Sequence, residues 1–309
     1  MPDTGLNQKN PVEKQHEPLL PEELGIKEGI REKVDSTLTQ GIIWEVIDQL
    51  LEENNGQEAD AFLMKLKQID RDAPDAEKTV KLMEILSEYS EHTVRHSRFM
   101  KKIIEKLGMV KDEEGFEVLR GLDTKQLGIV AERHDIGKLS MPDRLLNNSK
   151  GEYDKEAVRI KENHPTVGHL ILRVLDFDRE SQRLALTHHL KYKTEADGKV
   201  VLDGYPIDTF LEYCEGKGLE PELTTEDQIA AFTDVFSALM DTTRPNDRFG
   251  THEAEITVIE RCKKAFGVMD SKIFNDPYYS EGEGAELYSA FKAAMLKIAE
   301  NPHNLSVAA

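Results

Sequence analysis

The longest helical pattern in the chain covers residues 76–108, and it constrains the possible folds more than any other stretch. Its apolar residues recur with the spacing of one helix face. They are Leu82, Ile85, Leu86, Tyr89, Met100, Ile103, Ile104 and Leu107. Helical patterns also cover residues 42–51, 59–69, 123–134, 153–163, 166–175, 180–190, 226–241, 251–266 and 284–299. Strand patterns are confined to brief pieces such as residues 199–202, so we predict an all-α fold.

The sequence divides the chain into three parts. Residues 1–35 are polar and interrupted by prolines, so we expect a mobile tail. Residues 36–84 carry helical patterns but no chemistry that we can identify, and we expect a small helical accessory region. This region would serve in homodimerisation or in contact with a signalling partner. Residues 85–309 hold the residues with recognisable chemistry and are the expected main domain.

The net charge of −19 argues against binding to nucleic-acid polymers or to anionic membranes. A phosphate-bearing ligand would need a locally positive site, built from metal ions and a few Lys or Arg. No stretch approaches the ~18 apolar residues of a membrane span, and the N-terminus has no signal-peptide core. Cys214 and Cys262 form no close pair. We therefore expect a cytoplasmic protein with reduced thiols.

A histidine followed directly by an aspartate, His134-Asp135, places a nitrogen ligand beside an oxygen ligand. This pair suits a divalent ion of intermediate softness, such as iron, manganese, nickel or zinc. His92 and His96 are four residues apart and share a helix face. A buried, hydrogen-bonded pair is the alternative interpretation for these two alone. His164 directly precedes a proline, so we expect it at the boundary between two helices, where a ligand can point into a cleft.

The remaining ligand candidates lie further along the chain. His188 and His189 are adjacent near the end of a predicted helix. Asp234 lies in a strongly apolar helix, where a carboxylate is costly to bury unless it is paired or metal-bound. Together with His96, His134, Asp135 and His164 these make seven possible ligands, more than one ion needs. Such a set fits a two-metal site that is bridged by a carboxylate, in which a shared hydroxide serves as nucleophile. We interpret the other histidines as surface or structural residues: His16, His169, His252 and His303.

Further segments accompany these ligands in a fixed order between residues 85 and 280. They are Thr93-Val94-Arg95-His96-Ser97, His134-Asp135-Ile136-Gly137-Lys138, Met141-Pro142-Asp143-Arg144-Leu145-Leu146, Gly151-Glu152-Tyr153, His164-Pro165 with Gly168, His188-His189, Asp203-Gly204-Tyr205-Pro206, and Asp234-Val235-Phe236-Ser237-Ala238-Leu239 with Arg244-Pro245. As a set they resemble the HD-GYP group of the HD phosphohydrolase superfamily, which hydrolyses the bacterial second messenger cyclic di-GMP. The resemblance implies an HD-domain helical bundle over residues 85–309.

The resemblance also implies roles for single residues. A first ion would be held by His96, His134, Asp135 and Asp234, and a second by His164, His188 and His189. Asp135 would bridge the two ions. Lys138 corresponds to a lysine that faces the substrate phosphate, Arg244 to a second phosphate contact, and Tyr205 to a loop near the substrate. Asp135 and Lys138 are therefore the expected catalytic residues.

The chain departs from the family pattern at several positions. Leu190 stands directly after the histidine pair, where the family usually has a glutamate. The spacer from there to Gly204-Tyr205-Pro206 is longer than usual. His92 occupies the place of a glutamate that members with three metals use, so we favour two ions and keep His92 as a possible ligand of a third. Ser237 replaces the second aspartate of the family and is expected to act beside the ligands rather than as one of them.

From this resemblance we expect a phosphodiesterase that opens cyclic di-GMP to linear pGpG and continues to GMP in a further step. Two divalent ions, iron or manganese before nickel or zinc, would be its cofactors. The first alternative is a receptor or scaffold that keeps the metals and binds a cyclic dinucleotide without turning it over. A one-metal nucleotidase is a second alternative, which leaves His164, His188 and His189 without a role. The sequence does not separate cyclic di-GMP from cyclic GMP-AMP.

Overall fold

The computed structural model describes residues 47, 58–111, 119, 121–146, 154–241, 257–301 and 305. The predicted tail, 1–35, and the predicted helices before residue 58 lie outside these residues, apart from Ile47. Arg244 lies outside them as well. Within the described part of the chain, no helix has the length and apolarity that a membrane crossing requires.

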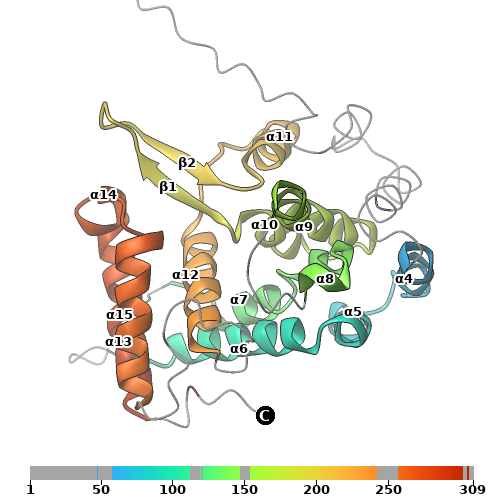
Figure 1. The fold of residues 1–309 in the computed structure, drawn as a ribbon, viewed down its shortest axis with the longest axis horizontal. Coiled ribbons are helices and arrows are strands. Elements are labelled where there is room, and N and C mark those ends of the chain that lie inside the picture. The colour runs from blue at the N-terminus through green and yellow to red at the C-terminus, as the bar shows by residue number, and fades with distance from the viewer. Residues whose placement is uncertain are drawn as a thin grey trace, which may run out of the picture.

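The described residues form helices around one short hairpin (Figure 1), and the all-α prediction is confirmed. The elements are α4 (Glu58–Lys67), α5 (Asp75–Tyr89), α6 (Glu91–Leu107), α7 (Thr124–Ala131), the 3₁₀ helix η1 (Ile136–Ser140), α8 (Asp143–Leu146), α9 (Lys155–Val174), α10 (Arg179–Thr187), β1 (Leu190–Thr194), β2 (Val200–Gly204), α11 (Ile207–Lys217), α12 (Thr225–Met240), α13 (Val258–Val268), the π-helix η2 (Met269–Ile273), α14 (Pro277–Ser280) and α15 (Ala285–Ala299). Strands β1 and β2 pair antiparallel, with Leu190 opposite Gly204.

The sequence suggested one continuous helix over residues 76–108, and this prediction is wrong. The segment breaks at Ser90 into α5 and α6. The side chain of Ser90 accepts a hydrogen bond from the amide of Thr93 at 3.2 Å, and its backbone, with φ −154° and ψ 87°, is not helical. A serine that caps a helix in this way satisfies one of the free amides of the first turn. The break leaves the apolar spacing almost unchanged, which is why periodicity alone did not reveal it.

The predicted boundary at His164-Pro165 is also wrong, because α9 continues through Pro165. A proline inside a helix has no amide hydrogen for the carbonyl four residues earlier, which here belongs to Lys161. The ring of His164 donates to that carbonyl instead, with Nδ1 2.5 Å from the oxygen of Lys161. The hydrogen bond that the proline removes is thus replaced by one from the neighbouring histidine.

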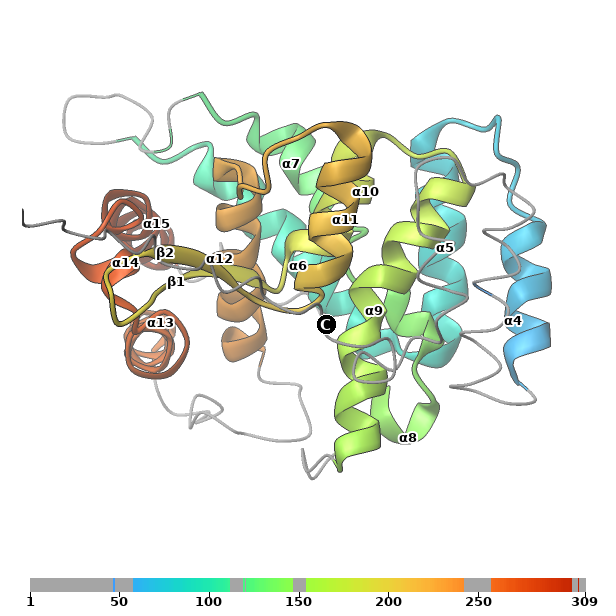
Figure 2. The same ribbon diagram turned by 90° about the horizontal axis from the view of Figure 1, so that it is seen from above.

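Two large apolar cores hold the helices together. The first joins α7, α12, α13 and α15, and the second joins α4, α5, η1 and α9. Helix α6 belongs to both, since Val94 packs in the second core and Phe99 in the first. Figures 1 and 2 accordingly place α13–α15 at one end of the molecule and α4 at the other. The seam between the cores crosses α6 next to His96, and it is there that polar side chains gather.

Gly137 in η1 packs closely against the backbone of α9 near this seam. A Cβ atom on Gly137 would lie 1.8 Å from the carbonyl oxygen of His164 and 2.5 Å from the amide nitrogen of Gly168. Both atoms belong to the backbone of α9 and have no freedom to rotate away. The absence of a side chain at Gly137 therefore lets the segment that carries His134 and Asp135 lie directly on the helix that carries His164.

We expect Gly137→Ala to lower the free energy of unfolding by about 3 kcal/mol, since overpacking against backbone atoms forces the two segments apart. Gly267→Ala is the matched control, because a Cβ atom there would meet nothing within 4 Å. That change should leave stability unchanged or raise it by up to about 1 kcal/mol. Urea denaturation of the metal-free protein measures both. Equal stability of Gly137→Ala and the wild type would contradict the close packing.

Candidate metal centre

Two groups of His and Asp side chains lie together at the seam. Each contains one possible ligand atom per residue within 4.8 Å of the others. The first group is His96, His134, Asp135 and Asp234, and the second is His164, His188 and His189. These are the seven residues that the sequence singled out, and all are buried except His189, which is half-buried. The structure therefore brings the whole predicted set together in the grouping that the resemblance implied.

Five separate segments supply these side chains. Helix α6 carries His96 and α12 carries Asp234. The turn between α7 and η1 carries His134 and Asp135. Helix α9 carries His164, while His188 caps the end of α10 and His189 follows it. Because α6, α9 and α12 are fixed by the apolar cores, the ligand positions are set by packing of the whole fold.

Asp135 lies between the two groups. Its Oδ2 is 3.3 Å from Nε2 of His134 and 4.0 Å from Nε2 of His96. Its Oδ1 is 3.4 Å from Nε2 of His164 and 3.8 Å from Nε2 of His188. One oxygen thus faces the first group and the other faces the second, which is the placement that a bridging carboxylate requires.

Asp234 completes the first group from α12. Its Oδ1 lies 2.7 Å from Nε2 of His96 and 3.4 Å from Nε2 of His134. Ser237, one turn later, has its hydroxyl 3.3 Å from Nδ1 of His96 and donates to the carbonyl of Asp234 at 3.0 Å. Ser237 therefore contacts the far side of the His96 ring and lies outside the ligand group itself.

Backbone carbonyls orient three of the histidine rings. The Nδ1–oxygen distances are 2.7 Å from His134 to Ala131, 2.5 Å from His164 to Lys161 and 3.0 Å from His188 to Ala185. A carbonyl only accepts hydrogen bonds, so in each neutral ring Nδ1 carries the proton. The Nε2 lone pair is then directed to the centre, which is how metal-binding histidines are commonly held.

Burial and charge set the ionisation of the group. Burial lowers the pKa of His164, His188 and His189, so these rings stay neutral, as ligation requires. Burial opposes ionisation of Asp135 and Asp234 too, but the neighbouring histidines, and Lys138 beside Asp135, hold both pKa values well below the usual range.

His134 behaves differently. Burial would lower its pKa, but the charges of Asp135 and Asp234 raise it to about 10. The two carboxylates thus favour positive charge at the Nε2 side of this ring. This is the same place to which the lone pairs of the other rings are directed.

Several polar atoms in the centre need a partner that the described residues do not supply. Nε2 of His134, Oδ1 of Asp135 and Nε2 of His189 are buried and make no hydrogen bond within the described structure. Such atoms are costly in a protein interior. A divalent cation in the first group would satisfy Nε2 of His134, and one in the second group would satisfy Oδ1 of Asp135. The donor set of imidazoles and carboxylates suits iron, manganese, nickel or zinc. The residues present therefore fit a metal centre.

The other predicted site residues lie at the edge of this centre or apart from it. Nζ of Lys138 is 2.5 Å from Oδ2 of Asp135, and the lysine side chain remains partly exposed. The ring of Tyr205 lies 4.6 Å from that of His189, tilted by 32°. His92 is not in either ligand group, and its Nδ1 is 3.3 Å from Oδ2 of Asp241.

Leu190 is a core residue. It is 1% exposed and packs in a small apolar cluster with Leu186, Phe210, Cys214 and Leu223. The long spacer that follows it forms the β1–β2 hairpin, where the sequence indicated a loop with one short strand pattern. A leucine at this position therefore stabilises the base of the hairpin and supplies no carboxylate to the centre.

Two neighbours of the centre were not found from the sequence. Arg133 is 2% exposed and donates to Thr79 at 2.8 Å, to Ser181 at 2.6 Å and to Asp178 at 3.0 Å. It thereby ties the segment before His134 to α5 and α10. Asp241, the partner of His92, lies seven residues after Asp234, which is two helical turns on the same side of α12. That spacing was a usable signal, whereas nothing in the sequence marked Arg133.

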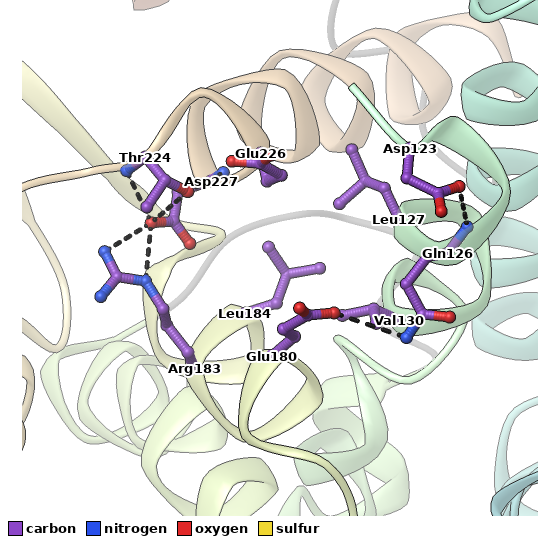
Figure 3. Close-up of a pocket in the computed structure, with 10 residues that line it drawn as sticks. All are labelled: Asp123, Gln126, Leu127, Val130, Glu180, Arg183, Leu184, Thr224, Glu226 and Asp227. Carbon is purple, nitrogen blue, oxygen red and sulfur yellow. Dashed lines mark hydrogen bonds and ion pairs between the residues drawn. The ribbon is translucent and has the colours of Figure 1, made fainter. Parts of the chain in front are cut away.

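A separate cavity of about 290 Å³ lies between α7, α10 and α12 (Figure 3). Leu127, Val130 and Leu184 form its apolar wall. On its rim, Arg183 donates to Asp227 at 2.7 Å. None of the seven candidate ligands lines this cavity, so it is distinct from the metal centre.

Comparison with known proteins shows what this chain is similar to. Residues 89–239 match the family model described as HD domain. The chain is 30% identical over 172 residues to a cyclic di-GMP phosphodiesterase of Thermotoga maritima. That match covers 52% of this chain but only 38% of the relative, so much of the relative has no counterpart in the match.

Among solved structures, the HD domain of the phosphodiesterase PgpH of L. monocytogenes is similar at 14% identity and a TM-score of 0.44. The alignment covers 72% of this chain and 98% of that domain. A second structure of the same domain, in complex with cyclic-di-AMP, has the same identity and TM-score and covers 71% of this chain and 96% of that one. The similarity to the HD domain model thus lies within residues 89–239, where the described residues are helical apart from the β1–β2 hairpin.

Proposed function

We propose that this chain is a metal-dependent phosphodiesterase that opens cyclic di-GMP to linear pGpG and hydrolyses this product further to GMP. The observation that carries the proposal is the position of Asp135, with one oxygen facing each ligand group. The similarity to a cyclic di-GMP phosphodiesterase supports the same substrate class.

The proposed centre would hold two divalent ions, iron or manganese. His96, His134 and Asp234 would hold the first, His164, His188 and His189 would hold the second, and Asp135 would be shared by both. When bound, such a pair supplies a nucleophilic water at neutral pH and offsets the negative charge of a phosphodiester under attack. Three of these histidines, His164, His188 and His189, remain neutral because burial lowers their pKa.

The role proposed for Lys138 is to bind the phosphate that is cleaved. Its ammonium group lies against Asp135 at the edge of the centre, and its side chain is partly exposed, so we propose that it reaches a ligand that enters from solvent. Tyr205, beside His189, is the proposed contact to the rest of the substrate. Arg244 remains a predicted second phosphate contact outside the described residues. With the ions, Lys138 provides the local positive charge that a chain of net charge −19 needs to bind a dianion.

One observation favours a second function, that of a cyclic-dinucleotide receptor. Leu190 is buried in an apolar cluster and brings no carboxylate to the position after the histidine pair. A centre without that carboxylate keeps its ligands but has one group fewer to orient water.

We expect the protein loaded with Mn²⁺ to convert cyclic di-GMP to pGpG and then GMP, because the centre contains both an ion-bridging carboxylate and a phosphate-binding lysine. Chromatography of the products over time measures this. Cyclic GMP-AMP is the matched competing substrate. Binding of cyclic di-GMP without turnover in either Fe²⁺ or Mn²⁺ would exclude the enzyme and select the receptor.

Asp135→Ala should remove both ions, since each group loses the carboxylate that it shares. Elemental analysis of the metal-loaded protein is expected to give about two ions per chain for the wild type and fewer than one for the variant. Asp197→Ala, which removes an exposed carboxylate between β1 and β2, should retain two. Two ions in Asp135→Ala would show that the bridging assignment is wrong, and one ion in the wild type would favour the one-metal nucleotidase.

Lys138→Met should keep both ions and lower kcat about 100-fold, because the change removes a single donor that stabilises charge on the phosphate. Lys125→Met, on the exposed side of α7, is the control and should have wild-type kcat. Steady-state rates and metal content measured on the same samples separate the two effects. Loss of metal from Lys138→Met would mean that this lysine maintains the centre and would argue against a role in phosphate binding.

A further inference from the structure

The β1–β2 hairpin begins and ends at the candidate metal centre. His189 directly precedes β1, and Tyr205 directly follows β2. The strands pair from Leu190 opposite Gly204 outward to Thr194 opposite Val200. A displacement of the hairpin therefore moves a proposed ligand at one end and a ring that lies against it at the other.

The two ends of the hairpin are in close backbone contact. Gly204 has a φ of +110°, and a Cβ atom on it would lie 2.3 Å from the carbonyl oxygen of His189. Only glycine allows this approach. The ring of Tyr205 then lies 4.6 Å from that of His189 and 6.3 Å from that of His164. Two members of the second ligand group thus pack against the residue that follows the hairpin.

Away from the centre, strand β1 is held by the segment around α14. The amide of Tyr192 donates to the hydroxyl of Tyr279 at 2.8 Å. The amide and the hydroxyl of Thr194 both donate to the carboxylate of Asp276, at 3.0 and 2.7 Å. Lys191 adds a hydrogen bond from Nζ to the carbonyl of Ile273 at 3.1 Å. Figure 1 shows the hairpin extending from the middle of the molecule toward α14.

The anchor is itself fixed. Tyr279 is buried, and its ring lies 5.7 Å from that of Phe232 on α12, two residues before the proposed ligand Asp234. Asp276 also caps α14 by accepting from the amide of Tyr278 at 2.9 Å. Helix α12, which carries one ligand, and the hairpin, which follows two others, are thus held by the same aromatic cluster.

We propose that Tyr279 and Asp276 are positioning residues of the second ion site. By holding β1 they set the places of His188, His189 and Tyr205, although neither touches a candidate ligand. This inference rests on the two-ion centre of the proposed function. The C-terminal segment around α14 would thus help to build the centre, although it contains none of the seven candidate ligands.

The effect expected from loosening this anchor is selective. The first group lies on α6, on the turn before η1 and on α12, and α12 is held in the first core by Ile229, Phe236 and Leu239 as well as by Phe232. His188 and His189, by contrast, lead directly into β1. Weakened support of metal ligands typically lowers metal affinity roughly 10- to 100-fold. Because Tyr279 and Asp276 act through β1, we expect the lower end of that range.

The test uses the combined variant Tyr279→Phe and Thr194→Val, which removes one acceptor and one donor from the anchor. Metal-free protein is titrated with Mn²⁺ by calorimetry, and His189→Ala marks which binding step belongs to the second group. We expect that step to weaken about tenfold while the first step stays within twofold of the wild type. Turnover of cyclic di-GMP at limiting Mn²⁺ should fall in parallel and recover at high Mn²⁺.

Tyr288→Phe is the matched control. Tyr288 is a buried tyrosine of the same cluster, and its hydroxyl donates to Asp270 at 2.9 Å without touching the hairpin. The Tyr288→Phe variant should lower the midpoint of thermal unfolding about as much as the anchor variant does. Its affinities for Mn²⁺ in both binding steps should equal those of the wild type. Tyr279→Phe alone provides a milder change if the combined variant does not fold.

The outcomes separate the inference from the proposed function. A wild type that binds fewer than two ions overturns the two-ion centre itself. Two ions in the wild type with an unchanged second step in the anchor variants overturns the positioning role. Equal weakening of the second step by Tyr288→Phe also overturns it, because general loosening of the cluster would then explain the effect.

Discussion

The buried negative charge of Asp135 is the constraint on which the rest of the structure depends. A carboxylate that is 1% exposed costs several kcal/mol unless other groups compensate for it. Here the compensation comes from His134 in the same turn, from His96 on α6 and His164 on α9, and from the nearby Lys138. The two apolar cores bring those helices to either side of the carboxylate, so the hydrophobic packing and the polar centre determine one another.

The sequence predicted the composition of the centre better than the course of the chain around it. The seven ligand candidates could be found because an HD pair, a histidine pair and an aspartate in an apolar helix are local signals. The helix break at Ser90 and the continuous helix at Pro165 were not predicted. Both depend on single hydrogen bonds, from Thr93 to Ser90 and from His164 to Lys161, that periodicity does not contain. The role of Arg244 remains a prediction from resemblance alone.

The hairpin was the least predictable part of the site. The β1 segment alternates apolar and polar residues over only five positions, and this signal was missed from the sequence. Its pairing with β2 is stabilised by partners far away in the sequence, including Tyr279 and Asp276. From the sequence, Leu190 was interpreted only as the absence of a carboxylate next to the histidine pair. In the structure its side chain packs in the apolar cluster at the base of the hairpin. A departure from a family pattern can therefore mark a local change of architecture as well as a change of chemistry.

Pro165 has a consequence for the ring of His164, which follows from the helix that both residues share. Because Pro165 has no amide hydrogen, the carbonyl of Lys161 lacks its usual helical donor and accepts from Nδ1 of His164 instead. This hydrogen bond fixes the tautomer of His164. The hydrogen bond that orients the ring lies within α9 and forms with the helix. The entropy of aligning the His164 ring is thus met when α9 folds, and binding at this ring would need little further ordering of it.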